Sequence, residues 1–180
     1  MKNYFQRMKG TSKCPPRKPL HKVIWSWIGS FLGIYLVFTI GKFLTSIDSL
    51  FLIGSFGASA VLIYGAPLAE FSQPRNLVGG HFISAIIGVT VFILLGDFPS
   101  LAAPMAVSLA IAVMHLTRTL HPPGGATALI AVIGGDRVHS LGYVYVLSPV
   151  FLGSIIMLLV ALLVNNMSTD AKRHYPVYWV

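Results

Sequence analysis

Ionisable and amide side chains lie within or beside the long apolar runs of this chain, where charge is costly to accommodate. The candidates for attracting or gating a charged ligand are Arg75, Asn76, His81, Arg118 and His121. Ionisable groups at such positions suggest a functional role by default. A guanidinium also suits a planar oxyanion, because it donates two parallel hydrogen bonds. The alternative is that both arginines are cationic anchors at the cytoplasmic ends of helices.

Two short stretches of small and hydroxyl residues match each other in order. Gly-Ala-Ser-Ala-Val-Leu at 57–62 aligns with Gly-Ala-Thr-Ala-Leu-Ile at 125–130. If a helix begins at each stretch, its free N–H groups and partial positive charge suit an anion. The predicted anion-binding residues are Gly57, Ala58, Ser59, Gly124, Gly125, Ala126 and Thr127. The alternative is that these small residues only permit close packing of helices.

The types and spacing of these residues give little support for metal binding or acid–base catalysis. His81, His115 and His121 match no zinc-ligand spacing, and no carboxylate lies near them in the sequence. His121 suits a turn-stabilising hydrogen bond better than direct proton transfer. The carboxylates all fall between or beyond the apolar runs, at Asp48, Glu70, Asp97, Asp136 and Asp170. We therefore predict no catalytic residue, no metal and no cofactor, and we do not expect an enzyme.

The elements that must position these residues are apolar helices in a membrane. Of the 180 residues 55% are hydrophobic and 10% are charged, whereas a soluble domain carries about a quarter charged residues. Six apolar segments cover 23–44, 51–68, 77–95, 101–117, 122–135 and 141–164. A full span needs about 20 residues. The second and fifth segments contain Gly and Pro and fall short, so we predict short or broken helices that begin near the midplane.

The six segments divide into two halves, 23–95 and 101–164, each with a short helix between two long ones. Six crossings from a cytoplasmic N-terminus leave every lysine and arginine except Lys42 and Arg137 on the cytoplasmic side. Re-entrant short segments would instead move Arg75 and Arg118 outside. The charge pattern favours six crossings. We therefore predict an all-α membrane protein made of two inverted three-helix repeats, with both termini cytoplasmic.

The two ends of the chain differ from the apolar region. Residues 1–22 form a basic arm that holds seven of the 13 lysines and arginines. The arm lacks the interleaved aromatics of a nucleic-acid binder and suits anionic lipid heads instead. Residues 165–180 are predicted to be a cytoplasmic tail. Its Tyr175, Tyr178 and Trp179 resemble an interfacial aromatic anchor.

Longer motifs resemble a known family. They are TRTLHPPGGATALIAVIGG (117–135), FGASAVLIYGAP (56–67), SQPRNLVGGHFISA (72–85) and the closing LVNNM and RHYPVYW. These motifs resemble the HPP family of integral membrane proteins, from about residue 17 to the end. Some members of that family are implicated in nitrite transport in plastids and cyanobacteria. The resemblance therefore implies a transmembrane HPP domain over 23–164 and suggests nitrite as a substrate.

The leading hypothesis is a transporter or channel for a small inorganic anion in the cell (inner) membrane. Its partners would be the lipid bilayer, the anion and further copies of the chain, because Gly- and Ala-rich faces favour homo-oligomers. A proton could accompany the anion through His81 or His121. One alternative is a membrane enzyme that acts on a lipid or phosphorylated substrate through His121 or His115, recognised by a His–hydroxyl or His–carboxylate pair. Another is a non-transporting scaffold or sensor with a sealed, apolar midplane.

Overall fold

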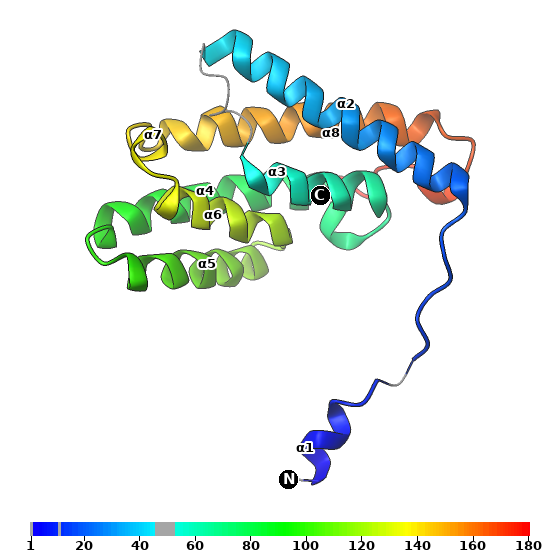
Figure 1. Ribbon diagram of the computed structural model, residues 1–180, viewed down its shortest axis with the longest axis horizontal. Coiled ribbons are helices and arrows are strands. Elements are labelled where there is room, and N and C mark those ends of the chain that lie inside the picture. Colours follow the sequence, from blue (N-terminus) through cyan, green and yellow to red (C-terminus); the bar gives the residue numbers. More distant parts are fainter. Residues whose placement is uncertain (1, 11, 46–52) are drawn as a thin grey trace.

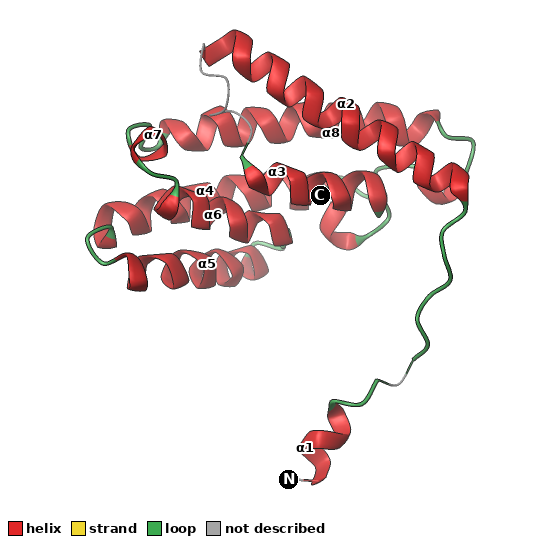
Figure 2. Ribbon diagram, viewed as in Figure 1, coloured by secondary structure: helices red, strands yellow, loops and turns green. Residues whose placement is uncertain are grey.

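A computed structural model describes residues 2–10, 12–45 and 53–180. Every regular element in these ranges is helical (Figure 2). The α-helices are α1 (Lys2–Arg7), α2 (Leu20–Thr45), α3 (Gly54–Ala60), α4 (Pro74–Leu95), α5 (Pro99–Leu116), α6 (Pro122–Ile133), α7 (Asp136–His139) and α8 (Leu152–Met167). The π and 3-10 segments are η1 (Val61–Gly65), η2 (Glu70–Ser72), η3 (Val146–Phe151) and η4 (Ala171–Arg173).

Four helical stretches in the described residues are long and apolar enough to cross a membrane. They are Leu20–Phe43, Pro74–Leu95, Pro99–Leu116 and Val146–Met167. Gly54–Gly65 and Pro122–Ile133 are shorter apolar helices. The all-α membrane class and the shortness of the second and fifth segments are confirmed. The inverted repeat and the six crossings stay predictions, and Asp48 and the expected helix start at 51–52 lie outside the described residues.

Two prolines determine where helix α6 begins. Pro122 and Pro123 occupy the first turn of α6, where a missing N–H costs no helical hydrogen bond. His121 precedes them in an extended conformation, with a φ of −135°, so the chain turns sharply into the helix. α6 stops at Gly134, and Gly135 follows with a φ of 73°, in the left-handed region that favours glycine. The predicted 122–135 segment is thus a helix of 12 residues.

The helices form two packed groups joined through α3 and α4. α4, α5 and α6 pack together on one side, α2 and α8 lie side by side on the other, and α3 lies between (Figure 1). The approach of α4 to α6 is very close. A Cβ on Gly88 would lie 2.6 Å from the carbonyl oxygen of Ala128, so glycine is required at this crossing.

The two ends of the helical bundle carry different contacts. At one end, Arg75 Nη2 donates to the Thr117 carbonyl at 2.9 Å, and the Tyr178 hydroxyl donates to the Glu70 carbonyl at 3.3 Å. We call this the basic end. At the opposite end, the rings of Phe92 and His139 stack with centroids 3.7 Å apart.

The C-terminal tail folds back onto the basic end. Tyr175 is buried, and its hydroxyl donates to the Ser72 carbonyl at 2.8 Å. The backbone N–H of Val177 donates to Gln73 Oε1 at 2.7 Å. Trp179 is exposed. Of the aromatics assigned to an interfacial anchor, Tyr175 therefore packs within the protein.

Candidate functional site

Five polar side chains meet in the interior of the helical bundle, and we call them the histidine–hydroxyl cluster. They come from three helices and one connecting segment, and none of them is exposed to solvent. The cluster consists of Ser55, Ser59, His81, His121 and Thr127. Polar groups buried within apolar helices need hydrogen-bond partners. The cluster supplies its own partners.

The cluster is linked end to end by short hydrogen bonds. Ser59 Oγ lies 2.7 Å from His81 Nε2 and 2.8 Å from His121 Nε2, so one hydroxyl bridges the two rings. His81 Nδ1 lies 2.7 Å from Thr127 Oγ1, which lies 2.8 Å from Ser55 Oγ. At the other end, His121 Nδ1 donates to the carbonyl of Phe71 at 2.7 Å. The result is one continuous chain from the Phe71 carbonyl to Ser55.

The first two turns of the two short helices lie beside each other at this cluster. Ser55 is the second residue of α3, and it contacts Thr127, the sixth residue of α6. His121 caps the start of α6 and contacts Ser59, one turn further along α3. α3 and α6 run away from each other in opposite directions (Figure 1). The starts of two helices therefore border the same buried polar site, although Pro122 and Pro123 have no N–H and the Gly124 N–H already donates to the His121 carbonyl at 2.7 Å.

Tight packing fixes the histidine rings. The His81 and His121 rings meet edge to face with centroids 4.9 Å apart, and Phe56 packs on His81 at 5.3 Å. A Cβ on Gly80 would lie 2.5 Å from the Cβ of His121. His121 therefore occupies the space that a side chain at position 80 would fill. The Tyr145 hydroxyl donates to the carbonyl of Thr127 at 3.1 Å and closes the far side.

The predicted anion-binding residues divide into two groups. The side chains of Ser59 and Thr127 belong to the cluster. Gly124 is buried against α4, where its Cβ would lie 2.7 Å from Ser84 Oγ, so it permits close helix packing. Gly125 is also buried, and Ala126 is half-buried. Gly57 and Ala58 lie on the exposed outer face of α3, away from the cluster.

The predicted charged residues line two neighbouring cavities at the basic end. One, of about 440 Å³, is lined by Leu68, Glu70, Arg75, Arg118, Tyr178 and Val180. The other, of about 350 Å³, is lined by Glu70, Phe71, Asn76, Met114, His115, Arg118 and Leu120. Both cavities share Glu70 and Arg118. We call them the basic-end cavities.

The arginines at these cavities have unusual surroundings. Arg118 has a φ of 58°, which is uncommon for a residue other than glycine. Arg75 donates through Nη2 to Thr117, and its buried Nε has no hydrogen-bond partner among the described residues. Both guanidinium groups line the same cavity, and a guanidinium binds anions through charge-assisted hydrogen bonds.

Phe71 lies between the basic-end cavities and the histidine–hydroxyl cluster. Phe71 lines the second cavity, and its carbonyl accepts the hydrogen bond from buried His121. Asn76 lines the same cavity and donates to the Leu120 carbonyl at 2.9 Å. The sequence-predicted residues thus form an outer group at the cavities and an inner group in the cluster. His115 belongs to the outer group.

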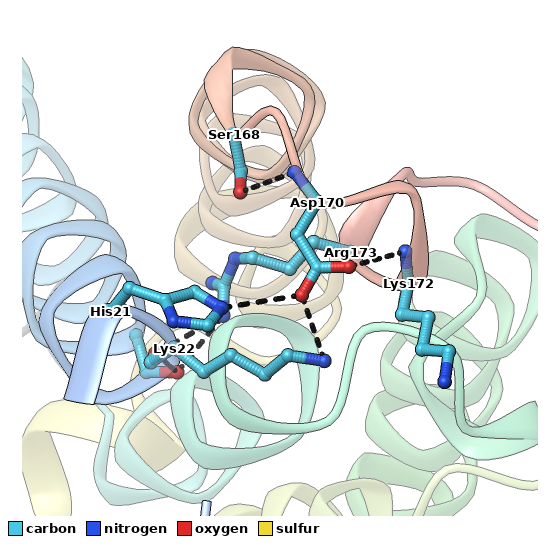
Figure 3. A network of polar contacts seen from close by, with 7 residues as sticks. His21, Lys22, Ser168, Asp170, Lys172 and Arg173 are labelled. Atoms are coloured by element: carbon cyan, nitrogen blue, oxygen red, sulfur yellow. Dashed lines mark hydrogen bonds and ion pairs between the residues drawn. The ribbon is translucent and has the colours of Figure 1, made fainter. Parts of the chain in front are cut away.

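Sequence reasoning missed a second polar network, which we call the terminal network (Figure 3). Arg173 is only 2% exposed, and its Nη2 donates to the Tyr64 carbonyl at 2.8 Å and to Asn165 Oδ1 at 2.9 Å. Its Nη1 donates to the Lys22 carbonyl at 3.3 Å. Burial lowers the pKa of Arg173, and Asp170 opposes that shift. The network joins α2, η1 and α8.

Asp170 completes the terminal network at its exposed side. Its Oδ2 lies 2.9 Å from Lys22 Nζ and 3.4 Å from His21 Nε2, and its Oδ1 accepts from the backbone N–H of Lys172 at 2.9 Å. The Lys22 contact and the Lys172 N–H hold the pKa of Asp170 well below its usual range. No group of three His, Cys, Asp or Glu side chains in the described part of the chain is placed to hold a metal ion.

Comparison with known proteins identifies the family. The HPP transmembrane region matches residues 15–176. Two transmembrane proteins of Dictyostelium discoideum are 46% identical over 181 residues and 44% identical over 184. These matches cover 98% of this chain but 57% and 63% of the relatives, so the chain spans about three fifths of their length. No solved structure matches the chain with significance. The chain is an integral multi-pass membrane protein and belongs to the HPP family.

Proposed function

We propose that this protein transports a small inorganic anion across the membrane, with nitrite as the candidate that the family suggests. The observation that carries the proposal is the meeting of two helix starts at a fully buried polar cluster. Broken helices whose N-termini point at a buried site are typical of transporters, and buried ionisable groups in a membrane are functional by default. A scaffold with an apolar midplane would need none of these features.

The chemistry of the site favours an anion over a cation. Hydroxyl and imidazole groups of the cluster can donate hydrogen bonds, and the cluster contains no carboxylate. Arg75 and Arg118 raise the local anion concentration at the basic-end cavities, although Glu70 offsets part of their charge. An anion would enter there and reach the cluster behind Phe71. Each cluster side chain is now hydrogen-bonded to another, so the anion would replace an internal bond when α3 and α6 separate.

A flux assay with the purified protein tests the proposal. We expect proteoliposomes to take up nitrite, nitrate, formate or chloride faster than protein-free liposomes. Arg118→Gln should slow the uptake by about tenfold, as expected for the loss of about 1.4 kcal/mol of attraction. The matched control is Arg17→Gln, which removes the same charge from the exposed arm. Uptake no faster than in empty liposomes for all four anions would overturn the proposal.

The same geometry supports one competing function. Ser59 between two histidines is a hydroxyl beside a base, as in enzymes that use a serine nucleophile. Ser59 is fully buried, however, whereas a nucleophile must reach its substrate. His115 lines a basic-end cavity and is separate from that pair. Stoichiometric labelling of Ser59 by an apolar serine-reactive phosphonate would favour a membrane enzyme; we expect none.

The assembly and orientation are part of the proposal. α3 exposes Gly54, Gly57 and Ala58 on its outer face, and small residues allow a second helix to approach closely. We therefore expect a homo-oligomer in mild detergent, measured by light scattering of the protein–detergent complex. The basic end is assigned to the cytoplasm, because Lys42 and Arg137 lie towards the opposite end. Protease access to the tail in inside-out vesicles tests that assignment.

A further inference from the structure

We propose that the histidine–hydroxyl cluster is a proton-binding site that takes up one proton, and that an anion binds only to the protonated cluster. The protein would then be a proton–anion symporter. The coupling to an anion rests on the proposed transport function. The binding of a proton to the cluster does not, so the two can be tested separately.

The hydrogen positions in the neutral cluster are determined at its two ends. The Phe71 carbonyl can only accept, so His121 Nδ1 carries a hydrogen. Thr127 donates its hydroxyl hydrogen to Ser55, so the hydrogen between Thr127 and His81 belongs to His81 Nδ1. In neutral rings the Nε2 atoms of both histidines are then acceptors. Ser59 has one hydrogen for these two acceptors, so one of its two contacts with the rings lacks a hydrogen.

One added proton completes the chain without moving any heavy atom. A hydronium gives up its proton, a new N–H bond forms at His121 Nε2, and a water molecule is left behind. His121 then donates through both nitrogens, and Ser59 accepts from His121 Nε2 and donates to His81 Nε2. The bonds from His81 Nδ1 to Thr127 and from Thr127 to Ser55 keep their hydrogens. The same distances serve both states, because hydroxyl and imidazole groups can each donate or accept.

Because of the groups that surround the cluster, the positive charge of the added proton controls whether an anion binds. In the described part of the chain, the titratable side chain that contacts the cluster besides the two histidines is Tyr145, through its hydroxyl at the Thr127 carbonyl. α3 contributes Ser55, Ser59 and Phe56, and α5 contributes Met114 beside Gly80. The charged groups Glu70, Arg75 and Arg118 lie at the cavities behind Phe71. A neutral cluster attracts an anion weakly, whereas a buried imidazolium and an anion neutralise each other.

A direct test of proton binding is ¹⁵N NMR of the histidine rings in the detergent-solubilised protein without added anion. We expect both rings as Nδ1–H tautomers at high pH, with the one Ser59 hydrogen available to either Nε2 atom. On acidification the two rings should share one proton and titrate together. Ser59→Ala should uncouple them, and His174→Gln, which changes an exposed tail residue, should not. Independent titration of the two rings in the unmodified protein would overturn the inference.

The coupling test uses proteoliposomes that contain a pH-sensitive dye, with nitrate as the probe because it does not cross as a neutral acid. An inward nitrate gradient should acidify the lumen, with one proton for each nitrate. Ser59→Ala should lower both fluxes together by at least about tenfold, the size expected for an unmade buried hydrogen bond. Nitrate uptake without acidification would overturn the coupling and leave anion transport intact. If neither nitrate nor any other anion enters while the NMR titration holds, the transport proposal fails and proton binding stands.

Discussion

The molecule contains two buried polar networks, and they are built on opposite principles. The histidine–hydroxyl cluster joins α3, α4 and α6 through groups that can each donate or accept. The terminal network joins α2, η1 and α8 through an arginine that only donates, backed by a carboxylate. Both networks connect segments far apart in the sequence. In the cluster the Ser59 hydroxyl can turn from one ring to the other, whereas in the terminal network the direction of each bond is fixed.

This difference indicates that the two networks have different roles. Arg173 contacts the Tyr64 carbonyl at the end of η1 and Asn165 in the last turn of α8. A permanent cation suits the carbonyl-rich ends of helices, so it holds them without switching. The cluster lies instead at helix starts, where an anion is favoured. We infer that the terminal network secures the fold while the cluster changes its state during function.

Removing the Arg173 side chain should have the largest effect on stability. Arg173→Met leaves buried Asn165 Oδ1 without its Arg173 donor and leaves the Tyr64 carbonyl with Ser26 Oγ alone. We expect a loss of about 3 kcal/mol or more in the free energy of unfolding, because each hydrogen bond from a charged donor contributes about 1.5–3 kcal/mol. Thermal denaturation in detergent measures it. Arg173→Lys keeps the charge but not the planar fork and should recover only part of the loss. A Met variant as stable as the unmodified protein would contradict the structural role of this network.

Gly80→Ala should disrupt the cluster without removing any polar atom. The added Cβ would lie 2.5 Å from His121 Cβ and 2.8 Å from the Thr119 carbonyl, so His121 must move. Overpacking of this kind costs about 1–3 kcal/mol. We expect a lower melting temperature together with a loss of anion flux. The control is Gly65→Ala, whose Cβ meets nothing within 4 Å among the described residues. Equal flux in both variants would show that the position of His121 is unimportant.

The sequence predicted the members of the cluster better than those of the terminal network. Ser59 and Thr127 were found because the two short helices resemble each other, and His81 and His121 because ionisable residues are rare in apolar runs. Ser55 was missed, although its spacing of four from Ser59 places both on one helix face. Local patterns could identify the cluster because each member lies in or beside an apolar segment.

The terminal network and the tail could not be predicted from local patterns. Arg173 lies in a polar tail, where a basic residue usually contacts water, and its partner Tyr64 is 109 residues away. The amide of Asn165 at the end of an apolar helix was the available signal, since it needs a partner. Tyr175 was assigned to lipid for the same reason, because nothing local indicates Ser72 as its acceptor. Tertiary contacts determine these positions.

Thr127→Val should separate function from stability within the cluster. Valine keeps the branched shape but removes the hydroxyl between His81 and Ser55. We expect a stability loss of about 2 kcal/mol, from the two buried hydrogen bonds of this hydroxyl at about 1 kcal/mol each. Anion flux and shared proton binding should fall much further. Thr127→Ser restores the hydroxyl and should recover both activities. If Val and Ser variants transport equally well, the cluster is a structural contact like the terminal network.

The smallest effect should come from Asp170, the exposed member of the terminal network. Lys22 and the Lys172 N–H lower the pKa of Asp170 in the folded protein, so its ionised form stabilises the fold. That contribution is fully present above the unfolded carboxyl pKa of about 3.9 and is lost as the pH falls below it towards the folded pKa. The melting-temperature difference between the unmodified protein and Asp170→Asn should therefore be constant from neutral pH to about pH 5 and shrink below about pH 4.

The size of the Asp170 effect distinguishes its contribution from that of Arg173. Exposed ion pairs contribute little and are screened by salt, so the difference should be small and should decrease further at high ionic strength. The loss in Arg173→Met should persist at high salt, because its hydrogen bonds are buried. Melting curves of both variants at low and high salt make the comparison. Equal salt sensitivity of the two variants would mean that Arg173 stabilises the fold in the same way as the exposed Asp170, and that the burial of Arg173 adds nothing to the free energy of unfolding.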